Sequence, residues 1–95
     1  MIVIRRVVGN SMLPTLRPGQ VIIGLGGDHF LSRWYSPLLR PGRIVIVRHN
    51  GLEKIKRITE LKKDQIYVLG DNPSASTDSR HFGWLFIEDV LAVIL

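Results

Sequence analysis

Short runs rich in valine and isoleucine, each bounded by Gly, Pro, Asn or Asp, are the feature that most constrains the fold of this chain. Interrupted runs of this composition are typical of β-strands. We expect six strands, at Ile2–Val8, Val21–Gly24, Ile44–Arg48, Glu53–Thr59, Gln65–Leu69 and Val90–Leu95. No window of about a dozen residues carries a helical apolar stripe, so helix should be confined to a turn or two, near Phe86–Asp89. The sequence predicts a mainly β fold, as a small open barrel or two packed coiled sheets.

Turn residues predict how some of these strands connect. Asn50-Gly51 tolerates the positive φ values of a type I′ turn, and it would fold Ile44–Arg48 back against Glu53–Thr59. Two Arg-Pro-Gly segments, at 17–19 and 40–42, each precede a β-branched run and are interpreted as strand entries. The aromatic-containing segment Asp28–Leu39 has no clear period, and we expect an excursion between two strands that could cover a hydrophobic cleft.

Composition sets limits on the class of protein. Ninety-five residues are enough for one domain with one core, so residues 1–95 are expected to form a single domain. The absence of Cys excludes disulfides, a thiolate nucleophile and Cys-ligated zinc. His29, His49 and His81 show no metal-ligand spacing, and we expect neither a metal nor a cofactor.

The charge and the apolar runs also argue against some partners. The formal net charge is +5, but the basic residues are scattered, so we interpret them as a solvated surface and expect no nucleic-acid partner. No run approaches the roughly 20 apolar residues of a membrane-spanning helix. Met1–Ile4 is followed at once by Arg5-Arg6, which is unlike a secretory signal. We therefore expect no membrane span in this chain.

Ser11 is the candidate nucleophile, and it needs a neighbouring base to remove its proton. The chain has no Gly-x-Ser-x-Gly elbow and no convincing Ser, Asp, His order. A lysine can act as the base if desolvation lowers its pKa from about 10.4 toward neutrality. Lys56 lies in an apolar run between Ile55 and Ile58, whereas Lys54, its competitor, would point to the same face of a strand.

Three sequence blocks, taken in order, resemble the signal peptidase I family of Ser/Lys serine endopeptidases of the S26 type. The blocks are Gly9-Asn10-Ser11-Met12-Leu13-Pro14-Thr15-Leu16, then Lys56-Arg57-Ile58, then the stretch from Gly70-Asp71-Asn72 to Asp78-Ser79-Arg80 and Gly83. The resemblance implies a small signal-peptidase-like barrel of coiled antiparallel sheets with little helix. It also implies that Ser11 attacks the scissile carbonyl, with its own backbone N–H helping to hold the oxyanion and Pro14 fixing the chain direction after it.

The resemblance assigns further roles by position. Lys56 would be the base, and Ser76 would form a hydrogen bond with its amine. Asp78 and Arg80 would form an ion pair that braces the loop behind the dyad. The chain departs from the pattern at Gly9, where some members supply a hydroxyl as the second oxyanion donor, so that donor stays unassigned. Arg43 and the segment 59–64 also differ from common members and leave substrate details open.

The hypothesis for function is removal of an amino-terminal leader from a precursor protein. A small anchorless member resembles the maturation proteases of nickel-type superoxide dismutase. The second enzymatic interpretation is a signal peptidase catalytic domain without its anchor. We expect a cytoplasmic location in the first case and membrane association in the second.

Two other classes fit less of the sequence. A small basic β-domain that binds nucleic acid or a peptide could use Trp34, Tyr35 and Trp84 for stacking, but it leaves the three blocks unexplained. The self-cleaving domain of SOS-type repressors also uses Ser/Lys chemistry. The block from Gly70 to Arg80 argues against that interpretation.

Overall fold

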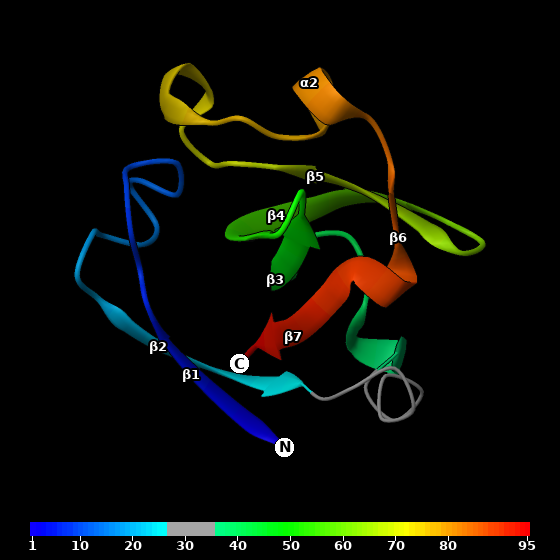
Figure 1. Cartoon of the computed structure of the whole chain (residues 1–95), viewed down its shortest axis with the longest axis horizontal. Helices are drawn as coiled ribbons and strands as arrows, with labels where there is room; N and C mark the ends of the chain where they lie inside the picture. Colours follow the sequence, from blue (N-terminus) through cyan, green and yellow to red (C-terminus); the bar gives the residue numbers. More distant parts are fainter. Residues whose placement is uncertain (27–35) are drawn as a thin grey trace.

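The computed structural model describes residues 1–26 and 36–95, and within these ranges seven strands form one antiparallel sheet. In the order of the sheet the strands are β1 (Ile2–Arg6), β2 (Val21–Gly26), β7 (Val90–Ile94), β3 (Ile44–His49), β4 (Leu52–Lys62), β5 (Gln65–Leu69) and β6 (Leu85–Phe86). Helix is limited to short pieces: η1 (Ser36–Leu38), η2 (Pro73–Ala75), α2 (Ser79–Phe82) and η3 (Ile87–Asp89). The sheet coils strongly, so that its first and middle strands face one another (Figure 1).

The mainly β class with little helix is confirmed, but the barrel needs a correction. The strands form one continuous sheet that is not closed into a barrel, and they do not divide into two packed sheets. At one end β6 has only two residues and pairs with β5, and at the other end β1 pairs with β2. Among the described residues no ladder joins these two ends, so the sheet stays open.

The expected strands all form, with changes at their ends. Strand β1 stops at Arg6 rather than Val8, whereas β4 runs to Lys62 through a register shift between Ile58 and Glu60. Short strand β6 was not predicted. The helical turn expected near Phe86–Asp89 is present as η3.

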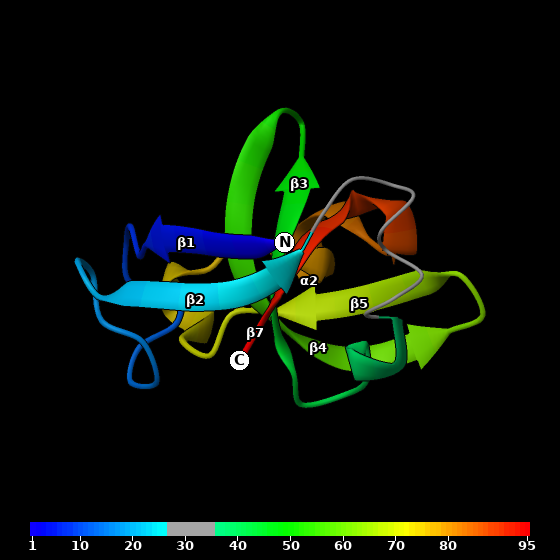
Figure 2. The ribbon, with the colours of Figure 1, turned by 90° about the horizontal axis from the view of Figure 1, so that it is seen from below.

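The hairpin between β3 and β4 forms as predicted. His49 pairs with Leu52, and Asn50 and Gly51 have φ values of 52° and 76°. Two consecutive positive φ values are the signature of a type I′ turn. Figure 2 shows this hairpin projecting beyond the β1–β2 pair. The pairing fixes the register of β4, and therefore the side of the sheet on which its lysines lie.

Strand β3 is buried on both sides and divides the core into two clusters. Val45 and Val47 belong to one cluster, and Ile46 belongs to the other, together with Met12 of the loop after β1. Alternate residues of a strand point to opposite faces, so both faces of this strand are covered. The second cluster matters for function because it anchors the loop that carries Ser11. The aromatic part of the predicted excursion, with Phe30, Trp34 and Tyr35, lies outside the described residues.

Candidate active site

Ser11 lies in a turn between β1 and β2, and buried neighbours hold that turn in place. Val7, Met12 and Leu16 are 4%, 1% and 7% exposed and pack in the second core cluster. The backbone N–H of Leu16 donates to the Met12 carbonyl at 2.9 Å, which closes the turn just after the serine. The Leu13–Pro14 peptide bond is cis. A loop anchored in this way holds the Ser11 hydroxyl in a fixed position.

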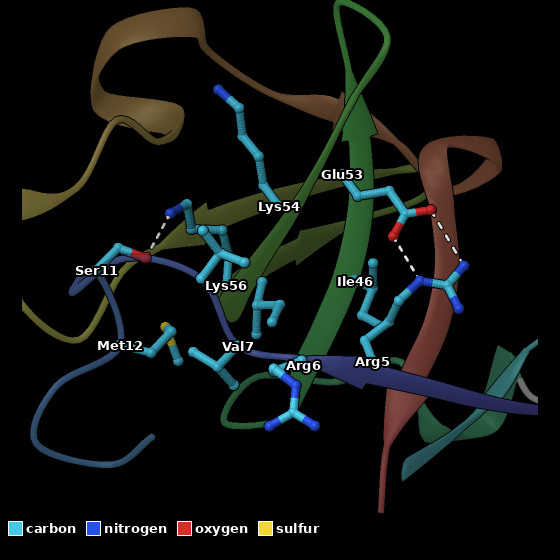
Figure 3. A pocket seen from close by; sticks show the side chains of 11 residues that line it. Arg5, Arg6, Val7, Ser11, Met12, Ile46, Glu53, Lys54 and Lys56 are labelled. Carbon is cyan, nitrogen blue, oxygen red and sulfur yellow. Dashed lines mark hydrogen bonds and ion pairs between the residues drawn. The ribbon is translucent and has the colours of Figure 1, made fainter. Parts of the chain in front are cut away.

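Lys56 belongs to strand β4 and lies opposite Ser11. Its side chain is buried, with 4% of the residue exposed, and its Nζ is 3.1 Å from Ser11 Oγ (Figure 3). Burial lowers the pKa of the Lys56 amine; the charge of Asp78 acts against this change, and the charge of Lys54 reinforces it. A lowered pKa increases the fraction of neutral amine, the form that can accept the hydroxyl proton.

Lys54 lies on the same side of β4 but points elsewhere. Its Nζ lies 4.9 Å from the centre of the Phe82 ring, in a cation–π contact with a residue of α2. The Phe82 ring is itself stacked on His49, with ring centroids 4.0 Å apart. The structure therefore brings Lys56, and not Lys54, to the Ser11 hydroxyl.

Asp78 is fully buried behind the dyad and accepts several hydrogen bonds. Its carboxylate receives the Gly70 backbone N–H at 2.9 Å and the Ser76 hydroxyl at 2.7 Å. The Arg80 guanidinium donates to both carboxylate oxygens, at 2.9 and 3.0 Å. Burial by itself would raise the pKa of Asp78, but these hydrogen bonds outweigh it and hold that pKa well below its usual range. The expected pairing of Asp78 with Arg80 is therefore present, with the aspartate buried and the arginine at the surface.

Ser76 occupies a different position in the network from the one expected. Its hydroxyl donates to Asp78, and no hydrogen bond in the described part of the chain joins it to Lys56. An ionised carboxylate is a stronger acceptor than a neutral amine, which explains this preference. Ser76 therefore forms its hydrogen bond within the loop behind the dyad and not with the Lys56 amine.

A second ion pair, which the sequence did not predict, links the strand that carries Lys56 to the loop that carries Ser11. Arg57, the residue after the base, donates to both oxygens of Asp71 at 2.9 and 2.7 Å, and Thr15 of the Ser11 loop donates to the same carboxylate at 2.6 Å. The Arg57 hydrogen bond is the main cause of the lowered pKa of Asp71. Both residues lie in the quoted blocks, yet nothing in their spacing indicates that they touch.

Residues 70–72 also pack directly on the nucleophile loop. The Asn72 backbone N–H donates to the Ser11 carbonyl at 2.8 Å, and the Asn72 side chain donates to the Asn10 carbonyl at 3.1 Å. A Cβ at Gly70 would lie 2.7 Å from the Ser11 carbonyl oxygen and would also overlap Ser76. Only glycine allows this close approach.

The Ser11 backbone N–H is available for a ligand, since no other described residue accepts a hydrogen bond from it. Gly9, at the position where some signal peptidases carry a hydroxyl, has a φ of 79°, which is the left-handed region. The backbone there suits glycine and would strain a residue with a side chain.

A groove with a volume of about 350 Å³ runs past the dyad. One wall is the segment Arg5–Val8, the other is the segment Glu53–Lys56 of β4, and Met12 and Ile46 contribute apolar surface between them. Figure 3 shows the Ser11–Lys56 contact toward one side of this groove and the Arg5–Glu53 ion pair toward the other. Among residues 1–26 and 36–95, no group of three or more His, Asp or Glu side chains is placed to hold a metal ion.

A comparison with known families finds a match over most of the chain. The profile of the family described as "Signal peptidase, peptidase S26" matches residues 29–94, well over half of the chain. The chain therefore belongs to the signal peptidase S26 family, and this membership supports a peptidase activity. The match includes Lys56 and Asp78 but begins after Ser11.

No match was found among curated proteins. Over the part of the chain that the structure describes, none of the helices has the length and apolar character needed to cross a bilayer.

Proposed function

We propose that this protein is a serine endopeptidase with a Ser11–Lys56 dyad that removes an amino-terminal leader from a precursor protein. The observation that carries the proposal is the 3.1 Å contact between a buried lysine amine and a serine hydroxyl beside a groove. The family membership supports peptide-bond hydrolysis as the reaction. The resemblance noted in the sequence suggests nickel-type superoxide dismutase as the precursor.

The groove suits an extended peptide because both of its walls have open backbone edges. Within the described residues β1 pairs with β2 alone, and β4 pairs with β5 only from Arg57 onward. The backbone of Glu53–Lys56 therefore meets a neighbour on its β3 side and is open on its other side. A substrate strand can add to such edges by main-chain hydrogen bonds.

The chemistry follows from the positions of three groups. The neutral Lys56 amine takes the Ser11 hydroxyl proton while Oγ bonds to the scissile carbonyl carbon. The oxyanion of the tetrahedral intermediate accepts the Ser11 backbone N–H. Collapse breaks the C–N bond, and the Lys56 ammonium donates its proton to the leaving amine.

The second half of the reaction repeats these roles with water. The neutral Lys56 amine deprotonates a water molecule, which attacks the ester carbonyl of the acyl-enzyme. The ester bond then breaks, the leader departs with a new carboxylate, and the Ser11 oxygen regains the proton from Lys56. Asp78 and Asp71 hold the loops that carry these groups and take no proton.

Incubating the protein with a leader-bearing nickel superoxide dismutase precursor, followed by mass spectrometry of the products, tests the proposal. We expect one cleavage at the leader junction and none with Ser11→Ala. Ser74→Ala, an exposed serine of the η2 turn, is the matched control and should cleave normally. If Ser11→Ala cleaves at the wild-type rate, the dyad mechanism is wrong.

A secretory signal peptide is the second candidate substrate, favoured by the printed description of the matching family. A precursor with such a signal, presented in detergent, distinguishes the two. Faster cleavage of the secretory precursor would identify the chain as a signal peptidase domain.

A further inference from the structure

Lys54 is a second cation on the side of β4 that carries the base. Residues two apart in a strand point to the same face, and Figure 3 shows the Lys54 and Lys56 side chains leaving β4 on the same side. Two ammonium groups on one strand face repel each other, so the charge of Lys54 favours the neutral form of Lys56. The neutral amine is the form that the proposed reaction needs.

No carboxylate neutralises Lys54. Within residues 1–26 and 36–95 none of the ion pairs includes this lysine. The neighbouring carboxylate of Glu53 receives both of its side-chain hydrogen bonds from Arg5, at 2.7 and 3.2 Å. Lys54 is also partly buried, so water and salt screen its charge less than that of a fully exposed lysine. Its full positive charge therefore acts on the groups around it.

Phe82 fixes the position of this charge. The Lys54 Nζ lies 4.9 Å from the centre of the Phe82 ring, which is the distance of a cation–π contact. The ring belongs to the last residue of α2, packs against the first core cluster and stacks on His49. A lysine without such a contact would extend into water, where its charge is screened. The aromatic ring therefore keeps the charge near the base.

Most other charges around Lys56 are paired with one another: Asp78 with Arg80, Arg57 with Asp71, and Arg5 with Glu53. The segment 9–16, which carries the nucleophile, contains no charged residue. The remaining titratable groups of the neighbouring strands are Arg6 of β1, which donates to the Gly19 carbonyl, and Arg48 and His49 of β3, which lie next to the hairpin turn. Burial is the main cause of the lowered pKa of Lys56, Asp78 acts against it, and Lys54 adds to it.

The strand geometry gives the size of the effect. The two lysines are roughly 7 Å apart along β4 at about 3.3 Å per residue, and their diverging side chains place the amines on the order of 10 Å apart. With an effective dielectric constant between about 20 and 80, a unit charge at roughly 10 Å changes a pKa by about 0.3–1.2.

We propose that Lys54 and Phe82 are positioning residues for the base: Phe82 holds the Lys54 ammonium near Lys56, and this fixed charge favours the neutral Lys56 amine. The inference rests on the proposed peptidase function, because it concerns the base of that reaction. Neither residue touches the reacting atoms, and both act through Lys56. Phe82 thereby gains a role that its place in the third sequence block does not indicate.

An NMR titration of the lysine side chains, labelled at Cε, measures the protonation of Lys56 directly and needs no substrate. The sequence contains four lysines, so single substitutions assign every signal. We expect the Lys56 midpoint to rise by about 0.3–1.2 pH units in Lys54→Met, and by part of this amount in Phe82→Leu. Lys54→Arg keeps the charge and Phe82→Tyr keeps the aromatic face, so both should restore the wild-type midpoint.

Lys62 and Trp84 provide the matched control. The Lys62 Nζ lies 4.5 Å from the centre of the Trp84 ring, so this pair repeats the cation–π contact at the far end of the same strand. It is roughly 20 Å from Lys56 at about 3.3 Å per residue, a distance at which salt screens its charge. Lys62→Met and Trp84→Leu should leave the Lys56 midpoint unchanged. An unchanged midpoint in Lys54→Met, or an equal rise in Lys62→Met, would overturn the inference.

The pH profile of kcat/KM with the leader-bearing precursor connects this charge effect to catalysis. In Lys54→Met the rising limb should move to higher pH by the amount that NMR measures, which lowers kcat/KM about 2- to 15-fold at a pH below the midpoint. A purely structural role would lower the whole curve without moving its limb, and that result would contradict the inference.

The two measurements separate this inference from the proposed function. If the Lys56 midpoint rises in Lys54→Met but the wild-type protein cleaves no precursor, the peptidase proposal fails and the charge effect stands. If the wild type cleaves the precursor and neither the midpoint nor the limb moves in Lys54→Met, only the role of Lys54 and Phe82 fails.

Discussion

Replacing Asp78 with alanine should destabilise the fold strongly, because this fully buried carboxylate satisfies other buried groups. The backbone N–H of Gly70 and the hydroxyl of Ser76 both donate to it from buried positions. A buried polar group that loses its partner costs about 1–3 kcal/mol, so these two groups together give roughly 2–6 kcal/mol. Loss of the Arg80 contact adds nothing to this free-energy cost, because the exposed Arg80 side chain can turn to water.

Thermal unfolding followed by circular dichroism measures this effect. For a domain of this size each kcal/mol corresponds to about 4–8 °C, so the melting temperature should fall by at least about 8 °C. Glu53→Gln is the matched control, because it removes a carboxylate from an ion pair that is largely exposed to solvent. Exposed pairs contribute little, so this variant should melt close to the wild type.

The pH dependence of the same measurement supplies a further check. The folded-state pKa of Asp78 is lowered, so its contribution is complete above the unfolded pKa of about 3.9 and is lost as the pH falls through the folded value. The Asp78→Ala protein should therefore lose less stability than the wild type as the pH falls through this range. A variant with the wild-type melting temperature would refute the reasoning that Asp78 supports the loop.

Three further variants test neighbouring features. Gly70→Ala should reduce cleavage of the precursor by at least tenfold, because the added Cβ would lie 2.7 Å from the Ser11 carbonyl oxygen and would push the nucleophile loop out of place; unchanged kcat/KM would contradict the close packing. Asp71→Asn should lower kcat more than it raises KM, since it weakens the link from Thr15 to Arg57, and Asp71→Glu should restore part of kcat; an effect confined to KM would contradict this role. Lys56→Met should raise the melting temperature at neutral pH. Burial lowers the pKa of the Lys56 amine in the folded state. At pH values below both its folded and its unfolded pKa, this burial costs about 1.4 kcal/mol of stability per unit of pKa shift. A lower melting temperature for Lys56→Met would contradict the desolvation argument.

The strands and the hairpin were predictable because their signals are local. Val- and Ile-rich runs and the Asn50-Gly51 turn act over a few residues, and the structure places strands at all six expected runs. Strand β6 was missed because Leu85–Phe86 is too short to show alternation, and α2 because four residues cannot show a helical stripe. Closure of the sheet depends on whether its distant ends meet, which no local pattern reports.

The candidate site was predictable in part for a similar reason. Ser11 and Lys56 were chosen from their blocks, and the structure brings them together across 45 positions of sequence. The link from Thr15 through Asp71 to Arg57 joins three segments, and its geometry depends on how the loops pack over the sheet. Ser76 was assigned to the base by position, but the buried Asp78 carboxylate next to it is the stronger acceptor.

The pH profile of kcat/KM, measured for wild type and Lys56→Arg with the leader-bearing precursor, tests the central claim most directly. Because burial lowers the pKa of Lys56, wild-type activity should rise as the amine loses its proton and should reach a plateau at a pH below its ordinary value of 10.5. Arginine keeps its proton throughout this range, so Lys56→Arg should be inactive at every pH, while Lys63→Arg should follow the wild-type curve. Cleavage by Lys56→Arg at the wild-type rate, or wild-type activity that does not rise with pH, would contradict a Ser11–Lys56 dyad.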